Sequence, residues 1–235
     1  MLENFNVTSL LLKRHVKISV YLPKNYNGSS EEYNSIFLLD GQNIFYDNYA
    51  DNGISMKLAN SLDDNEANVI VFAIHSPKNN DWRLSEFIPF KTENENMDPT
   101  LAYKFVDFIN DSLLPLLEYR YRLNNNRTII GFNEGAISAA YIANHINKFN
   151  YVGLFSPVCN LCYNDTLNLF SEVVKKKIVH LYYGGLDEEF DNIGYKIFQV
   201  LDKTNNQNVV FDYEANQKND IIVWNKHIIS IINKM

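Results

Sequence analysis

Residues 128–140 (Thr-Ile-Ile-Gly-Phe-Asn-Glu-Gly-Ala-Ile-Ser-Ala-Ala) constrain the fold of this chain more than any other segment. The first three residues are β-branched and predict a buried strand, and the small residues at the end predict a helix. Gly131 and Gly135 flank the turn between them, where strand and helix pack too closely for most side chains. We expect a positive φ for Asn133, at the centre of the turn, because Asn visits that region more readily than most residues.

The spacing Gly-x-Asn-x-Gly resembles the Gly-x-Ser-x-Gly nucleophile elbow of α/β-hydrolases, a sharp turn that exposes a serine above the sheet. In this chain Asn133 stands at the serine position. A carboxamide is a very poor nucleophile, so the substitution can preserve the turn but not ordinary acyl-enzyme chemistry. A chance arrangement of two glycines is the alternative, and the strand and helix patterns on either side argue against it.

The composition is that of one domain covering residues 1–235, because 46% hydrophobic residues can form a single large core. The net charge is −7, and the Lys and Arg residues are scattered. This distribution argues against binding to nucleic acid or to a membrane surface. No apolar run approaches the roughly 18 residues of a membrane span, and the N-terminus lacks a signal-peptide layout. We therefore expect a cytoplasmic protein.

Cys159 and Cys162 form a single Cys-x-x-Cys pair. A structural zinc site needs four ligands, and the sequence has no second pair to complete one. We expect two buried thiols in a reducing compartment, with a redox pair as the alternative. The sequence indicates neither a metal site nor a cofactor.

The order of the predicted elements is typical of an α/β fold with a mostly parallel sheet. Alternating patterns at 7–12 and 16–22 predict an antiparallel hairpin, and apolar runs predict buried parallel strands. These strands are expected at 35–39, 69–74, 127–130, 151–155, 178–183 and 209–213. Helices are expected at 53–62, from Asp98 onward with a kink at Pro115, and at about 135–147, 188–203 and 221–233.

Ligands of such sheets bind at the carboxyl ends of the strands, so the residues that follow each strand are the candidates for a binding site. They are Asp40, Gly41, Gln42, His75, Ser76, Asn133, Glu134, Ser156, Asp187, Glu188 and residues 216–220.

Four further segments match, in the same order, the sequence motifs of a known family. They are residues 20–26 (Val-Tyr-Leu-Pro-Lys-Asn-Tyr), 35–45 (Ser-Ile-Phe-Leu-Leu-Asp-Gly-Gln-Asn-Ile-Phe), 83–89 (Arg-Leu-Ser-Glu-Phe-Ile-Pro) and 108–121. Together they resemble the putative-esterase family of α/β-hydrolases, which includes esterase D, S-formylglutathione hydrolases and enterobactin esterases. The resemblance implies an α/β-hydrolase sandwich with helices on both faces of the sheet. It also implies the activity of a carboxylic-ester hydrolase.

The resemblance assigns positions to a catalytic serine, acid and histidine. The nucleophile position is Asn133, and the acid position is Asp187, with Glu188 as its neighbour. The histidine position, counted back from Trp224, is Asn219. Two members of the triad are thus replaced by Asn, and loss of the serine or the histidine costs roughly a million-fold in turnover.

The resemblance also implies an oxyanion hole formed by backbone N–H groups of the loop at Gly41 and Gln42 and of Glu134. These donors do not depend on a side chain, so a carbonyl group could still dock there. The carboxylates of Glu134, Asp187 and Glu188 would make the entrance acidic. We therefore expect a small ester-like or neutral ligand, or a cationic one.

Of the five histidines, only His75 is expected at the ligand-binding edge, and we interpret it as a loop residue rather than a chemical group. His15, His145, His180 and His227 are expected at the surface or in packing. The leading hypothesis is an esterase-fold protein that has lost hydrolysis and keeps a ligand-binding or structural role.

The alternative is an ester hydrolase with a rearranged site, in which His75 and Asp187 position water. A third hypothesis is a homo-oligomer that associates through some of its 15 Tyr and 15 Phe side chains.

Overall fold

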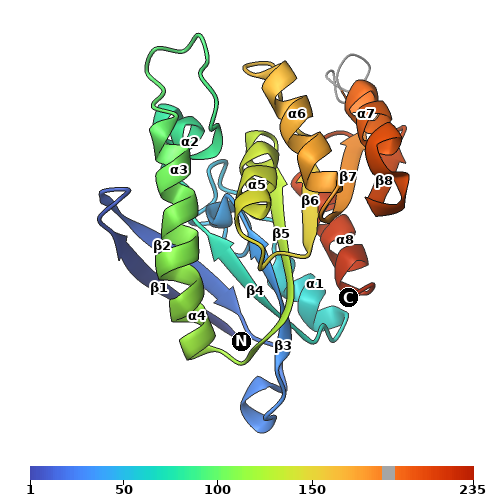
Figure 1. The fold of residues 1–235 in the computed structure, drawn as a ribbon. Helices are drawn as coiled ribbons and strands as arrows, with labels where there is room; N and C mark the ends of the chain where they lie inside the picture. Colours follow the sequence, from blue (N-terminus) through green and yellow to red (C-terminus); the bar gives the residue numbers. More distant parts are fainter. Residues whose placement is uncertain (187–193) are drawn as a thin grey trace.

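An eight-stranded sheet lies at the centre of the structure, a computed structural model that describes residues 1–186 and 194–235 (Figure 1). The strand order is β1-β2-β4-β3-β5-β6-β7-β8. The strands are β1 (Leu2–Ser9), β2 (Arg14–Tyr21), β3 (Tyr33–Leu38), β4 (Val69–Ile74), β5 (Leu123–Phe132), β6 (Tyr151–Phe155), β7 (Ile178–Gly184) and β8 (Val209–Glu214). β2 pairs antiparallel with β1 and β4, and the pairs from β4 to β8 are parallel. The predicted mostly parallel sheet with an N-terminal antiparallel hairpin is confirmed.

The hairpin begins and turns earlier than predicted. Residues 10–13 form its turn, in which Leu12 N donates to Ser9 Oγ at 3.1 Å and Lys13 has a φ of 52°. Leu10 is largely exposed there. The prediction was wrong at this end because the leucines in the turn continue an apolar pattern without belonging to the strand.

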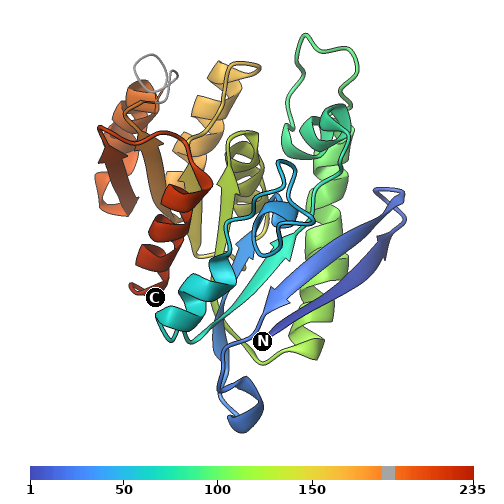
Figure 2. The ribbon, with the colours of Figure 1, turned by 180° about the vertical axis from the view of Figure 1, so that it is seen from behind.

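Helices cover both faces of the sheet, as Figures 1 and 2 show from opposite sides. One face carries α2 (Asn80–Phe87), α3 (Thr100–Asp107), α4 (Leu114–Arg120), α5 (Glu134–His145), α6 (Tyr163–Val174) and α7 (Tyr195–Asn205). The other face carries α1 (Leu58–Asp64) and α8 (Ile221–Ile232). Short 3₁₀ turns occur at η1 (Tyr26–Gly28), η2 (Gly41–Asn43) and η5 (Asn206–Asn208).

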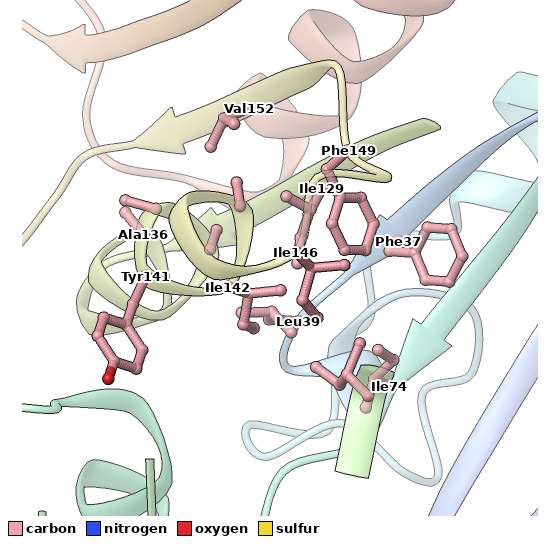
Figure 3. Packing of buried hydrophobic residues seen from close by; sticks show 14 of the residues in the cluster. Phe37, Leu39, Ile74, Ile129, Ala136, Tyr141, Ile142, Ile146, Phe149 and Val152 are labelled. Carbon is pink, nitrogen blue, oxygen red and sulfur yellow. The ribbon is translucent and has the colours of Figure 1, made fainter. Parts of the chain in front are cut away.

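Two hydrophobic clusters correspond to these two faces. In the larger cluster, Ile142 and Ile146 from the α5 side lie near Leu39 and Phe149 (Figure 3). The smaller cluster joins β-strand side chains to α1 and to Trp224 of α8. Because both faces are covered, β4 is buried along its whole length, which explains its continuous apolar sequence.

The helix predicted from Asp98 has a wide π turn, η3 (Phe108–Leu113), between α3 and α4. α3 begins at Thr100, after Asp98 and Pro99, and Asp98 Oδ1 accepts a hydrogen bond from Thr100 N at 3.0 Å. Pro115 stands at the start of α4, directly after the π turn. A proline lacks the N–H of a helical bond and its ring crowds the carbonyl four residues earlier, so irregular hydrogen bonding is expected here.

Other helix boundaries differ from the prediction. The helix expected at 53–62 begins only at Leu58, and α2 and α6 were not predicted. The Asn79 side chain caps α2 by accepting from Trp82 N at 3.0 Å, a signal visible in the sequence. The helix expected at 188–203 is observed from Tyr195, and its first residues lie outside the described part.

Both Cys159 and Cys162 are buried, as expected. In the described residues, no helix combines the length and the apolar character that crossing a bilayer requires.

Candidate functional site

The turn at Asn133 joins β5 to α5 with a strained backbone. Asn133 has φ 52° and ψ −123°, the positive φ expected for it. A Cβ on Gly131 would lie 1.9 Å from Gly135 O, so only glycine fits there. A Cβ on Gly135 would lie 3.4 Å from the Phe87 ring, an ordinary contact. The first glycine of the motif is therefore required by packing, and the second is not.

Positive φ values gather at this edge of the sheet. Asp40 after β3 has a φ of 52°, and Ser156 directly after β6 has a φ of 46°. Gly41 is held so close to β4 that a Cβ would lie 2.4 Å from the carbonyl carbon of Ala73. Strained backbone is often found at binding sites, which supports a functional role for this edge.

Asn133 and Asn219 are in direct contact. Asn219 Nδ2 donates to Asn133 Oδ1 at 2.5 Å, although the residues are 86 positions apart. Asn219 is positioned by the start of α8, where Asp220 Oδ1 accepts from Ile222 N at 2.7 Å. The structure thus brings together the positions that the resemblance assigned to the nucleophile and the histidine. Asp187 and Glu188, at the acid position, lie outside the described residues.

Arg83 of α2 links two carboxylates at the same edge. Its Nε and Nη2 donate to Asp40 Oδ1 and Oδ2 at 2.8 and 2.7 Å, and its Nη1 donates to Glu134 Oε2 at 3.0 Å. Burial lowers the pKa of Arg83, but the bonds to Asp40 and the charges of both carboxylates outweigh burial and raise it. The Glu134 carboxylate is therefore paired with a cation, a contact that was not predicted from the sequence.

Gln42 and Ser76 extend this polar network. Gln42 Nε2 donates to Ser76 Oγ at 2.8 Å, and Ser76 N donates to Gln42 Oε1 at 3.1 Å. Ser76 Oγ in turn donates to Asp40 Oδ1 at 2.7 Å. The side chains that follow β3 and β4 therefore hold the loop at residues 40–42 in one arrangement.

A cleft of about 1000 Å³ opens above Asn133. Asn133, Glu134, Asn219 and Trp224 line it, together with Asp40 and Arg83. Its lining includes the four carboxylates of Asp40, Asp51, Glu134 and Asp220 and the two cations of Lys78 and Arg83. A cleft of this size can hold a small organic molecule.

His75 is turned toward the N-terminal hairpin. Its Nε2 lies 2.8 Å from Ser19 Oγ, and Ser19 Oγ donates to Asn4 Oδ1 at 2.6 Å. Burial, followed by the charges of Lys17 and Arg14, lowers the pKa of His75 to about 4. Neither His75 nor the loop residues Gly41 and Gln42 are among the described residues that line the cleft.

A family model described as "Putative esterase" matches residues 9–224. The chain belongs to the putative-esterase family. The match spans the strand-end loops, Asn133 and Asn219. No curated protein sequence matches the chain.

Several solved structures share the putative-esterase fold of this chain. An IroE-like serine hydrolase from Shewanella oneidensis has a TM-score of 0.80 and 19% identity, over 100% of this chain and 79% of that one. An S-formylglutathione hydrolase from Agrobacterium tumefaciens has a TM-score of 0.69 and 13% identity, over 100% and 95%. An enterobactin esterase from Shigella flexneri has a TM-score of 0.76 and 15% identity, over 100% and 58%. At these identities the similarity is one of fold.

Arg83 is a site residue of this putative-esterase member that was not predicted from the sequence. Arg83 lies in the resembling segment at 83–89, but its partners Asp40 and Glu134 are 43 and 51 residues away along the chain. The signal that could have identified it is the family-like segment at 83–89 itself, which places a basic residue after the end of β4.

Proposed function

We propose that this putative-esterase member has lost serine-ester hydrolysis and binds a small ester-like or neutral molecule in the cleft above Asn133. The observation that carries the proposal is the hydrogen bond between Asn219 and Asn133. Two carboxamides meet where a serine hydrolase needs a hydroxyl group and an imidazole. Neither amide can act as the nucleophile, and neither can accept the proton of one.

The chemistry of the pair supports this view quantitatively. Loss of the nucleophile or base of a triad costs roughly a million-fold in turnover, which is about 8 kcal/mol of transition-state stabilisation. The remaining acceleration in such variants, roughly a thousand- to ten-thousand-fold over water, comes from binding and the oxyanion hole. With conversion slowed to this extent, a bound substrate-like molecule would dissociate unchanged far more often than it would be hydrolysed.

Features of the cleft support retained binding. α5 begins at Glu134, so the N–H of Glu134 lies in the first turn, where helical N–H groups have no acceptor within the helix. Trp224 and Phe132 supply an apolar wall, with ring centroids 4.6 Å apart. Arg83 fixes the carboxylates of Asp40 and Glu134 through ion pairs of 2.7 and 3.0 Å. A carbonyl group directed at the helix and an apolar body against the rings fit this arrangement.

The charges of the cleft favour a neutral or cationic ligand. Carboxylates outnumber cations among the lining residues, and all three nitrogens of the Arg83 guanidinium already donate to Asp40 or Glu134. A free carboxylate or phosphate would meet this negative potential, and among the described lining residues the Lys78 ammonium is the one cation outside the Arg83 ion pairs that could receive it. We expect thermal-shift measurements to show stabilisation by neutral esters or amides and none by acetate or phosphate.

Turnover of a p-nitrophenyl ester series tests the proposal. The expected rate equals that of the Asn133→Ala variant, and a fluorophosphonate probe should leave the protein unlabelled at neutral pH. Turnover clearly above that variant would favour the alternative of a hydrolase with a rearranged site. Stoichiometric labelling of any serine would contradict the proposal outright.

A further inference from the structure

Three side chains from three elements meet on the α8 face of the sheet, away from the cleft. His180 lies on β7, Asp212 on β8 and His227 on α8. Tyr182 pairs with Asp212 across the two strands, and the alternation of side chains therefore places His180 and Asp212 on the same face. α8 covers that face and brings His227 to them.

Both imidazole rings direct a nitrogen at the same carboxylate oxygen. His180 Nε2 lies 2.8 Å from Asp212 Oδ2, and His227 Nδ1 lies 3.2 Å from it. The three atoms lie within 4.8 Å of one another. Ligand atoms of a tetrahedral zinc ion with bonds of 2.0–2.1 Å are roughly 3.3 Å apart. The two separations from Asp212 Oδ2 are close to this value, and the two ring nitrogens lie within 4.8 Å of each other.

Each histidine also has an outer partner on its other nitrogen. Tyr151 Oη lies 3.1 Å from His180 Nδ1, and Glu214 Oε1 lies 3.3 Å from His227 Nε2. Histidines that bind metals usually have a carboxylate or another polar group at the second nitrogen, which fixes the ring and the position of its proton. If His227 has its proton on Nε2, toward Glu214, its Nδ1 lone pair is available to a cation.

Without a bound cation, the surroundings of His227 are electrostatically unfavourable for a neutral imidazole ring. The ring faces a carboxylate on each side, from Asp212 at Nδ1 and from Glu214 at Nε2. A neutral ring has one N–H, so one of its nitrogens would direct a lone pair at a carboxylate oxygen. A bound cation beside Nδ1 removes this conflict and compensates the Asp212 charge.

The cluster is accessible and distinct from the cleft. His180 is fully buried and His227 is nearly so, but about a third of the Asp212 side chain is exposed, which leaves room for water at a further coordination position. None of the three residues lines the cleft. The ring of Phe155 lies between them, with its centroid 5.9 Å from that of His180 and 5.7 Å from that of Phe132.

We propose that His180, Asp212 and His227 bind a zinc ion, with water completing the coordination. Two imidazoles and one carboxylate suit Zn²⁺ and neighbouring transition metals, whereas Ca²⁺ and Mg²⁺ prefer all-oxygen sites. The three residues are separated by 32 and 15 positions, so the site could not be predicted from a short ligand-spacing motif in the sequence.

Titration of chelator-treated protein with ZnCl₂, in competition with a chromophoric chelator, tests the proposal. One equivalent should bind, and His180→Asn or Asp212→Asn should abolish that binding. Glu214→Gln should weaken it by about 10- to 100-fold through the outer contact to His227. The controls are His15→Asn, in the exposed hairpin, and the double variant Cys159→Ser/Cys162→Ser, both of which should bind like the unmutated protein.

NMR of the histidine rings provides a readout that needs no variant in the cluster. Of the five histidines, addition of Zn²⁺ should shift the ring nitrogens of two, which His15→Asn, His75→Gln and His145→Gln identify as His180 and His227 by elimination. Loss of zinc binding in either control, shifts confined to His15, His75 or His145, or the absence of one-equivalent binding would each overturn the proposal.

Discussion

Asn219 donates a hydrogen bond to Asn133 across 86 residues of sequence, in the place where the resemblance to serine esterases assigns the histidine and the serine. The backbone around the pair retains the geometry of a strained strand-to-helix turn, with Asn133 at a φ of 52°. The frame of the site and its side-chain chemistry can therefore be tested separately.

Ester hydrolysis should return only when a serine at position 133 and a histidine at position 219 are introduced together. The double variant Asn133→Ser/Asn219→His should hydrolyse p-nitrophenyl acetate detectably, because the two side chains are already within hydrogen-bond distance. Each single variant should stay at background, since a serine without a base and a base without a nucleophile are both inactive.

Adding Asp187→Asn to the double variant tests the acid position. This third substitution should lower the restored rate of ester hydrolysis substantially. Equal activity of Asn133→Ser alone and of the double variant would show that another base already faces the turn.

Gly131→Ala should destabilise the protein by several kcal/mol, because the new Cβ would lie 1.9 Å from a backbone oxygen that cannot move independently. Gly135→Ala is the matched control in the same turn and should stay within about 1 kcal/mol of the parent, since its Cβ makes an ordinary contact. Urea unfolding monitored by circular dichroism measures both free energies. Similar losses for the two variants would contradict the packing argument.

Arg83→Met should cost about 3–5 kcal/mol of folding free energy, because it leaves the buried Asp40 carboxylate without its cation. Asp40→Asn in the same background should recover part of this loss, since it removes the uncompensated charge. A double-mutant cycle from urea unfolding of the four proteins measures the coupling. Additive losses in the cycle would mean that the ion pair contributes little.

His75 should make the protein less stable in mild acid. Burial lowers its folded pKa to about 4 from an ordinary value of 6.5, so the unfolded chain binds the proton more readily. The stabilisation is fully present above pH 6.5 and is lost as the pH falls from 6.5 toward 4, by up to about 3 kcal/mol. The difference in unfolding free energy between pH 7.5 and pH 5 should therefore be larger for the parent than for His75→Gln. An equal pH dependence would assign the effect to other groups.

The local pattern of the sequence was sufficient for the main elements of the fold. Apolar runs at β4, β6 and β7 predicted buried strands because a parallel sheet covered on both faces buries the side chains of both orientations. The prediction failed where an apolar residue lies in a turn, as at Leu10, or where polar residues occupy buried positions of a short helix, as Ser85 and Glu86 do in α2.

The sequence by itself determined that the turn at Asn133 forms and that it lacks a serine, because both follow from residue types within one short segment. Only the tertiary structure decided what surrounds that turn. The contact of Asn219 with Asn133, the pairing of Arg83 with Asp40 and Glu134, and the meeting of His180 with Asp212 and His227 each join distant segments. Sheet register and helix docking set these contacts, and neither is encoded in the spacing of the residues concerned.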